Sequence, residues 1–373
     1  FEPLKFEFLI GDHEPERTRV FWTPTIAGNF YDKFMLGVAI HNYGAPTSKF
    51  NYIVAPFYSF GRQMVSGMSD FNYTFLPKKN LKTSRFGVSL KSFKNDSTFK
   101  RNDSYYVAVS PYWIAKIGSR KDNSPVSQYI KIQTIYKKDK VGPTHLERLG
   151  AYAEYNLDYV KVDHNVNVKL RNEYYTDVKN SDEMGRILFE STYRFRYIRK
   201  KMNRWIELRG FVGHTYLNNF SPTNAYQYSM SLSGADGQQD LFVDEYYFGR
   251  NETQGIWSQQ RDENMGGFKS TSWYGTTSYT MATANLYFQF PIKPNIFGVF
   301  ADFGTFYNGT SFNGAINTGL ALRLGKVFGV YFPLWMSKQM DAAYNSKNYA
   351  ERIRFTLKMN IQSKPLNFMK LLN

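Results

Sequence analysis

The sequence has 373 residues, no cysteine and a formal net charge of +16 at pH 7. The lack of cysteine excludes disulfide scaffolds, cysteine-ligated zinc, iron–sulfur clusters and thiol catalysis. No apolar run reaches the roughly 18 residues that a membrane-spanning helix needs, although 18% of the residues are aromatic. If this chain crosses a membrane, it must therefore do so with β-strands.

The chain begins with a polar, irregular stretch, residues 1–16, which we expect to be a periplasmic entry segment. Over residues 17–360 apolar and polar residues alternate, as Ile187 and Phe189 do with Glu190. Successive side chains of a strand point to opposite faces, so these segments have one apolar face and one charged face. We expect strands at 18–28, 33–43, 50–61, 64–76, 83–93, 104–117, 126–138, 148–160, 164–177, 185–198, 204–218, 224–234, 239–249, 280–291, 296–307, 315–325, 327–337 and 348–360.

Two features favour a membrane barrel over a soluble sandwich or propeller. The segments are often ten residues or longer, whereas strands of soluble proteins average about 5–6 residues. Their polar faces carry charges of both signs at mid-strand, and Tyr, Trp and Phe flank their apolar faces. We therefore predict an all-β fold: a closed antiparallel transmembrane outer-membrane β-barrel of about 18 strands, within a range of about 14–18, with both termini periplasmic.

Charged residues of both signs share the polar positions of neighbouring strands. We predict that they form a lattice of ion pairs across the strands inside the barrel; an anion-preferring pore is the alternative. The surplus cations lie mostly in expected turns, where they would suit either anionic lipid phosphates or plain solvation. The predicted lattice residues are Lys169, Arg171, Glu173, Glu190, Arg194, Arg196, Glu207, Arg209, Arg323, Arg352 and Arg354.

One connection, residues 250–279, is too long for an idle loop of a compact domain. We expect it to fold into the lumen or over its mouth. The C-terminal residues 361–373 mix Lys with Leu, Phe and Met, and we expect either a tail on the inner membrane interface or a frayed end. The expected anchors of the long loop are Asp244, Glu245, Arg250, Gln259 and Gln260.

The sequence contains no complete catalytic or metal-binding motif. Residues 13–17 begin like the zinc motif HExxH, but Arg17 stands where the second His is required. We therefore expect no metal, no cofactor and no enzymatic activity of this chain. Basic residues interleaved with aromatic ones suit single-stranded nucleic acid, but here the basic residues share their faces with acidic ones.

Several stretches carry a resemblance to a known family, in the expected order over nearly the whole chain. They are 21–24 (FWTP), 31–37 (YDKFMLG), 241–252 (LFVDEYYFGRNE), 258–260 (SQQ), 266–269 (GGFK), 301–304 (ADFG), 330–334 (VYFPL) and 351–357 (ERIRFTL). Together they resemble the C-terminal outer-membrane β-barrel region of Bacteroidetes zinc metallopeptidases of the aminopeptidase N-like (gluzincin) class. In that family the catalytic domain with HExxH precedes this region, so the resemblance assigns no catalytic residue to this chain.

The leading hypothesis is a β-barrel of the bacterial outer membrane that anchors an upstream metallopeptidase-like domain, with a second role as a conduit for that domain's substrates or products. The alternative is a stand-alone channel or scaffold subunit of a multi-protein outer-membrane complex. A soluble basic β-protein that binds nucleic acid is a lesser alternative. The partners expected for the leading hypothesis are outer-membrane lipid, including lipopolysaccharide, and other envelope proteins, but no nucleic acid.

Overall fold

The fold of the described residues is all-β, and 17 of their strands belong to one hydrogen-bonded sheet. None of the helices in these residues has the length and apolar character needed to cross a membrane. The computed structural model describes residues 5–8, 19–44, 48–77, 80–95, 104–118, 124–198, 204–220, 226–250, 255–270, 272, 274–325, 327–343 and 348–358.

Most of the predicted strands are confirmed within a few residues, and 104–117, 164–177 and 204–218 coincide with observed strands. The sheet strands are β1 (Lys5–Phe8), β2 (Arg19–Asn29), β3 (Lys33–His41), β4 (Phe50–Ser59), β5 (Met64–Phe75), β6 (Leu81–Phe93), β7 (Ser104–Ile117), β8 (Val126–Val141), β9 (Thr144–Val160), β10 (His164–Asp177), β11 (Glu183–Ile198), β12 (Arg204–Asn218), β15 (Thr280–Gln289), β16 (Phe297–Tyr307), β17 (Phe312–Leu324), β18 (Phe328–Met336) and β19 (Arg354–Leu357).

The chain divides into two compact units, and strands β8 and β9 contribute residues to both. Closure of the sheet into a barrel, the number of barrel strands and the side on which the termini lie stay predictions. Of the expected entry segment only residues 5–8 are described, and the tail 361–373 lies outside the described residues. Unit 1 is Phe1–Asp122, Tyr129–Tyr152 and Asp177–Asn180, and unit 2 is Asn123–Gln128, Ala153–Thr176 and Ser181–Asn373.

In unit 1, strands β2 to β7 pair antiparallel with their neighbours in chain order. The turn after β2 is shaped by Asn29, whose Oδ1 accepts the backbone N–H groups of Tyr31 and Asp32 at 2.8 and 2.6 Å, a local bond that Asn favours in turns. Strand β1 differs from the others because it pairs parallel to β2, with Lys5 opposite Arg19.

In unit 2, strands β10, β11, β12, β15, β16, β17, β18 and β19 pair antiparallel in that order. Strands β12 and β15 are neighbours, with Ile206 opposite Phe288, so the chain between them is an insertion between adjacent strands. We call residues 226–275 the internal segment. Short elements in and beside it are η1 (Tyr226–Tyr228), β13 (Met230–Ser231), η2 (Ile256–Gln259) and β14 (Thr276–Thr277), and helices α2 (Lys338–Ala342) and α3 (Tyr349–Arg352) lie between β18 and β19.

Three strand predictions need correction. The expected strands 224–234 and 239–249 are wrong, because the described residues there form η1, the two-residue strand β13 and turns. The connection that was expected at 250–279 therefore already begins after β12. The expected strand 348–360 is only partly right, since α3 precedes the short strand β19.

The two faces of the sheet in unit 2 have reversed exposure compared with a soluble protein. On β12, Leu208 is 45% exposed while its neighbour Arg209 is 9% exposed, and on β16 Phe303 is 47% exposed while Asp302 is fully buried. Soluble proteins bury their apolar residues and expose their charged ones. We call the two sides the apolar face (Leu170, Ile187, Phe189, Leu208, Val212, Leu286, Phe303 and Leu320) and the polar face (Glu173, Arg186, Glu190, Arg209, Asn285, Asp302, Asn317 and Arg323).

Aromatic rings form contacts near both ends of the strands. In unit 1 one end has the ring pairs Phe34–Phe60 and Tyr58–Phe60, and the other end has a chain of rings over β5, β6 and β7. In unit 2 the pair Tyr197–Phe288 lies at one end, at 5.0 Å between ring centres. At the other end of unit 2 the contacts are Tyr279–Tyr307 at 5.6 Å and Tyr307–Phe312 at 5.2 Å.

Candidate functional site

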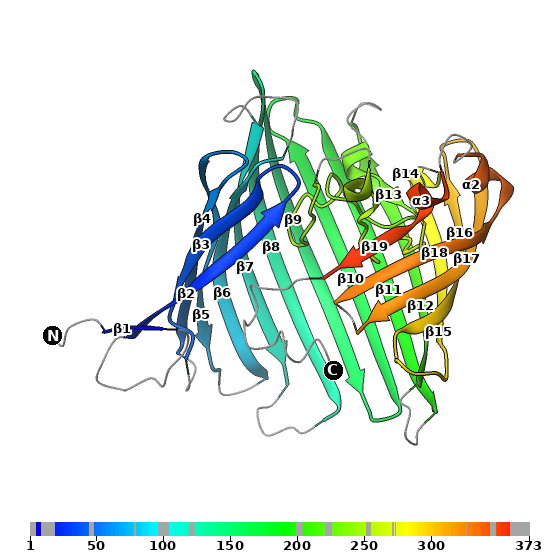
Figure 1. Ribbon diagram of the computed structural model, residues 1–373, viewed down its shortest axis with the longest axis horizontal. Helices are drawn as coiled ribbons and strands as arrows, with labels where there is room; N and C mark the ends of the chain where they lie inside the picture. The colour runs from blue at the N-terminus through cyan, green and yellow to red at the C-terminus, as the bar shows by residue number, and fades with distance from the viewer. Residues whose placement is uncertain are drawn as a thin grey trace. The chain divides into compact units, whose positions relative to one another are not determined.

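The candidate site is the interface between the internal segment and the polar face of unit 2 (Figure 1). Side chains on several strands bond the backbone of the segment. Arg186 on β11 donates to the carbonyl of Tyr228 at 2.8 Å, and Arg354 on β19 donates to that of Ser233 at 2.7 Å. On β16, Asp302 accepts the backbone N–H of Lys269 at 2.7 Å.

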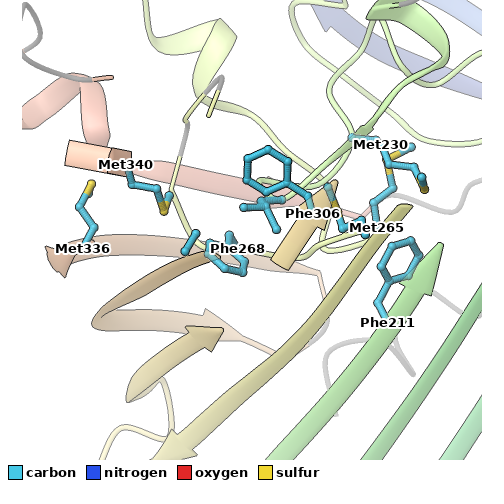
Figure 2. Close-up of a cluster of buried hydrophobic side chains, with 11 residues drawn as sticks. Phe211, Met230, Met265, Phe268, Phe306, Met336 and Met340 are labelled. Atoms are coloured by element: carbon cyan, nitrogen blue, oxygen red, sulfur yellow. The ribbon is translucent and has the colours of Figure 1, made fainter. Parts of the chain in front are cut away.

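An apolar cluster fills the centre of this interface (Figure 2). Phe268 and Met230 of the internal segment are fully buried, against Phe211 of β12 and Phe306 of β16. The segment therefore contributes to the hydrophobic core of unit 2, and its removal would expose that core. The whole cluster is Phe211, Met230, Leu232, Ala235, Met265, Phe268, Met281, Phe306, Ala315, Met336 and Met340.

Buried Asp302 is the centre of one polar group. Its Oδ1 accepts a hydrogen bond from Asn285 at 2.9 Å and lies 3.8 Å from the ammonium of Lys269. Asn285 in turn accepts a hydrogen bond from Arg209 at 2.9 Å, and Arg209 also bonds Glu190 at 2.8 Å and the carbonyl of Met265 at 2.8 Å. Charges of the sheet are thus neutralised and hydrogen-bonded together with groups of the segment, as buried charges require.

A second polar group connects β12 and β17, which are not neighbours in the sheet, and includes a residue of the internal segment. Arg323 on β17 lies 3.0 Å from Glu207 on β12 and 3.7 Å from Glu263 of the internal segment. The hydroxyl of Tyr331 on β18 donates to Glu263 as well. Burial by itself raises the pKa of Glu263, but Arg323, Lys269 and Lys358 outweigh that effect and hold its pKa well below the usual range.

A third group lies on β10 and β11, where Glu173 accepts hydrogen bonds from Arg186 and, at 2.7 Å, from the hydroxyl of Tyr175. Arg171 forms an ion pair with the other oxygen of Glu173, at 2.6 Å, and lies 4.0 Å from Asp244 of the internal segment. The guanidinium of Arg171 also lies 5.2 Å from the ring centre of Phe242. This group holds the part of the segment that precedes Arg250.

Other polar bonds shape the segment itself. Arg250 bonds Asp240 at 2.9 Å and the carbonyl of Glu245 at 2.7 Å. Gln260 accepts the N–H of Phe248 and donates to the carbonyl of Tyr246, both at 2.7 Å. These bonds hold parts of the internal segment to one another rather than to the sheet.

Glu245 and Lys269 of the segment have pKa values shifted towards the neutral form. The nearby Asp262 carboxylate and burial raise the pKa of Glu245 to about 8. Burial lowers the pKa of Lys269, which the negative charge of Asp302 opposes. The main cause for Glu245 is thus repulsion by a like charge, and that for Lys269 is the removal of its charge from water.

Of the predicted lattice residues, several are brought together as expected. Arg209 pairs with Glu190, Arg323 with Glu207 and Arg171 with Glu173, and Lys169 stands opposite Glu190 in the strand register. Arg194 lies 3.9 Å from Glu207, and Arg196 contacts the ring of Trp205. Arg354 is fully buried, and it bonds backbone carbonyls of the internal segment.

The placement of Arg352 in the strand lattice is wrong. Arg352 belongs to α3 and lies 2.7 Å from Asp341 of α2, because the chain forms two short helices where a single strand was expected.

The predicted anchors of the long loop have mixed outcomes. Asp244 contacts Arg171 of the sheet, and Gln259 donates to the carbonyl of Ala350 at 2.7 Å. Arg250 and Gln260 bond within the segment instead. Arg186, Asn285 and Asp302 are strand residues that anchor the segment, and the signal available for them was a polar residue on the charged face of a strand. All the missed anchors are Arg186, Asn285, Asp302, Lys269 and Glu263.

Close approach of the backbone explains one glycine of the segment. A Cβ atom added at Gly266 would lie 2.4 Å from Cα of Leu232 and 2.5 Å from its carbonyl oxygen. Only glycine lets the two stretches of the segment approach this closely.

The arrangement holds a segment in place, and its carboxylates are used in ion pairs and hydrogen bonds. Within the described ranges no group of three or more His, Asp or Glu is placed to hold a metal ion.

No protein-family model matches the chain, and no curated protein matches its sequence. Among solved structures, a similar one is "CdiB from Acinetobacter baumannii", at 10% sequence identity and a TM-score of 0.38. The match covers 85% of this chain and 56% of that chain, so this chain spans little more than half of that neighbour. A likeness this weak assigns neither a family nor an activity.

Proposed function

We propose that this chain spans the bacterial outer membrane as a closed β-barrel, with the internal segment fixed inside it, and anchors a metallopeptidase-like domain there. The observation that carries the proposal is the reversed exposure of the sheet: Leu208 and Phe303 face outward while Arg209 and Asp302 are buried behind them. A sheet with that distribution is stable where lipid covers its apolar side.

The spacing of the aromatic rings agrees with this proposal. On β4, Phe50 and Tyr58 are both 46% exposed on the same face and lie near opposite ends of the strand. Eight residues of strand span about 26 Å, and a tilt of about 40° reduces this height to about 20 Å, close to the roughly 25 Å apolar band of outer-membrane barrels. Tyr, Trp and Phe are the side chains that favour both membrane interfaces.

The docked segment favours an anchor or scaffold over an open channel or a conduit. It is held by an apolar cluster, by ion pairs to β10, β16 and β17, and by a hydrogen bond from Arg209 on β12 to the carbonyl of Met265. Basic strand residues such as Arg209 and Arg323 are paired with Glu190 and Glu207 of the sheet, which disfavours nucleic-acid binding.

The barrel itself is tested with the purified chain in detergent and in lipid vesicles. We expect heat-modifiable mobility on a detergent gel and resistance of the vesicle-bound chain to carbonate extraction. A monodisperse, folded chain in buffer without detergent would contradict the proposal.

The state of the barrel is tested by conductance across a planar bilayer. We expect the intact chain to give no steady openings and a variant lacking residues 226–275 to give them. Steady openings of the intact chain, equal to those of the variant, would mean an open pore and would reject the fixed segment.

The anchoring role is tested by the intact mass of the native polypeptide in its own membrane. We expect a mass well above the 43.5 kDa of this chain, together with zinc-dependent peptidase activity in the same membrane fraction. A mass of 43.5 kDa would reject the anchor and leave the second candidate, a stand-alone scaffold of an outer-membrane complex.

A further inference from the structure

Two arginines of β11 contact the same indole ring on the polar face of unit 2. The guanidinium of Arg194 lies 4.6 Å and that of Arg196 lies 5.0 Å from the ring centre of Trp205 on β12. In the strand register Arg196 stands opposite Trp205, and Arg194 stands opposite Glu207. We call Arg194, Arg196 and Trp205 the arginine–tryptophan site.

The site has fewer carboxylates than guanidinium groups. Glu207 is the acid that pairs with Arg194, and it lies closer to Arg323, at 3.0 Å, than to Arg194, at 3.9 Å. The side chain of Arg196 has neither a hydrogen-bond acceptor nor an ion-pair partner in the described part of the chain, and its Nε atom is buried. A guanidinium in this position is stabilised by an acceptor that the sheet does not supply.

The polar-face residues of β10 that stand opposite this part of β11 are amides, and Asp163, just before β10, accepts the backbone N–H of Arg196 with its carbonyl at 2.7 Å. In the register of β10, Asn165 stands opposite Arg194 and Asn167 opposite Thr192. Asn167 is itself bonded to Asp158 of β9 at 2.6 Å, so that carboxylate is already engaged. Both arginines remain half-buried, and 30% of the Arg194 side chain is exposed, so a ligand can reach the site from solvent.

The spacing of the two arginines indicates which anion fits. Residues two apart on one strand are separated by about 6.6 Å, and the same spacing separates alternate side chains of any extended peptide. Stacking on Trp205 holds the guanidinium planes in fixed orientations, so that each can bind a carboxylate through two parallel hydrogen bonds. A single phosphate would engage only one of them in this way.

We propose that the arginine–tryptophan site binds an acidic peptide segment in an extended conformation, with carboxylates on alternate residues. The site lies on the polar face next to the connection between β11 and β12, and Glu207 connects it through Arg323 to Glu263 of the internal segment. The proposal depends on unit 2 alone and holds whether or not the chain anchors a peptidase.

The test uses the full chain in detergent and a fluorescein-labelled peptide of sequence Glu-Thr-Glu-Thr-Glu, with Gln-Thr-Gln-Thr-Gln as the neutral match. We expect fluorescence anisotropy to show saturable binding of the Glu peptide that weakens with salt, and binding of the Gln peptide at least about tenfold weaker. Equal binding of the two peptides, or no binding of the Glu peptide, would overturn the proposal.

Variants locate the binding. Arg196→Gln and Arg194→Gln should each lower the affinity for the Glu peptide by about tenfold or more. The control is Lys293→Gln, at an exposed lysine in the connection between β15 and β16, which should change this affinity by less than about twofold. Heat-modifiable mobility confirms that each variant is folded. An equal loss in Lys293→Gln would mean non-specific attraction, and displacement of the peptide by inorganic phosphate at equal concentration would mean a simple anion site; both results reject the proposal.

Discussion

Arg323 and Glu207 lie 3.0 Å apart although two strands, β15 and β16, separate the strands that carry them. Neighbouring strands are about 4.8 Å apart, so three such steps in a flat sheet would separate their backbones by about 14 Å, with both side chains perpendicular to the sheet. The contact therefore means that unit 2 curves strongly towards its polar face. Curvature of this sense is what closure into a barrel requires.

The first prediction concerns the buried charge of Arg209. Arg209→Leu leaves Glu190 without its partner at 2.8 Å, and we expect it to lower the free energy of unfolding by about 3 kcal/mol. Leu208→Ala, its neighbour on the apolar face, is the matched control and should cost less in detergent, because Leu208 is 45% exposed. Denaturant unfolding of the two variants in the same micelles measures the difference, and equal midpoints would contradict the role given to Arg209.

The second prediction concerns the apolar attachment of the internal segment. Phe268→Ala opens a cavity at a fully buried position, which should destabilise docking by about 4 kcal/mol. We expect limited proteolysis to cut the segment of this variant much faster than that of the parent chain. Ile256→Ala, at a position 62% exposed on the same segment, should leave the cleavage rate unchanged; the same acceleration in both variants would show that Phe268 is not an anchor.

The third prediction uses two glycines of unit 2. Gly266→Ala places a methyl group 2.4 Å from Cα of Leu232, and the forced shift should cost about 3 kcal/mol. Gly210→Ala on β12 meets no atom within 4 Å and should be neutral or stabilising by about 0.5 kcal/mol. Thermal unfolding of both variants tests the close approach, and a stable Gly266→Ala protein would argue against it.

The fourth prediction concerns pH. The folded-state pKa of Glu245, about 8, is above its ordinary value of 4.5, so the folded chain binds the proton more tightly than the unfolded chain. This contribution to stability is fully present below about pH 4.5 and is lost as pH rises through about 8.

Between pH 5 and pH 9 we expect the free energy of unfolding of the parent chain to fall by about 2 kcal/mol relative to that of Glu245→Gln. This figure is reduced because the side chain is partly exposed. Unfolding midpoints of both proteins across that range measure the loss. Parallel pH profiles would show that Glu245 titrates normally. The other charges that act on Glu245 are Asp262, Lys358, Asp240 and Asp244, and they are kept in both proteins.

The strands could be predicted from the sequence because apolar and polar positions alternate with a period of two. This alternation also placed Arg209 and Arg323 among the charged residues of the polar face, although it did not identify Glu190 and Glu207 as their partners. The internal segment could not be predicted in the same way. Met230 and Leu232 alternate with Ser231 and Ser233 as in a strand, yet all four are buried, because the segment has contacts on both sides. Alternation in sequence does not distinguish a strand with one buried face from a chain enclosed by its neighbours.

The anchors were missed for a related reason. Lys269 and Glu263 meet Asp302 and Arg323 only through the tertiary fold, and no local spacing marks such partners. Arg186 did carry a signal, since it shares its strand face with Glu190. However, Gly185 and Met184 before it interrupt the charge pattern, and the signal was missed for this reason.

The parallel pairing of β1 with the start of β2 has a mechanical consequence. Lys5 to Phe8 run beside Arg19 to Trp22, and the ring of Phe8 lies 5.0 Å from that of Trp22. Tension applied through residues that precede Lys5 pulls β1 along the direction of its partner, so the backbone hydrogen bonds of the pair bear the load together rather than breaking one after another. A pull on the N-terminal side of unit 1 therefore loads the pair of β1 and β2 in shear, the direction of load under which a pair of strands separates least readily.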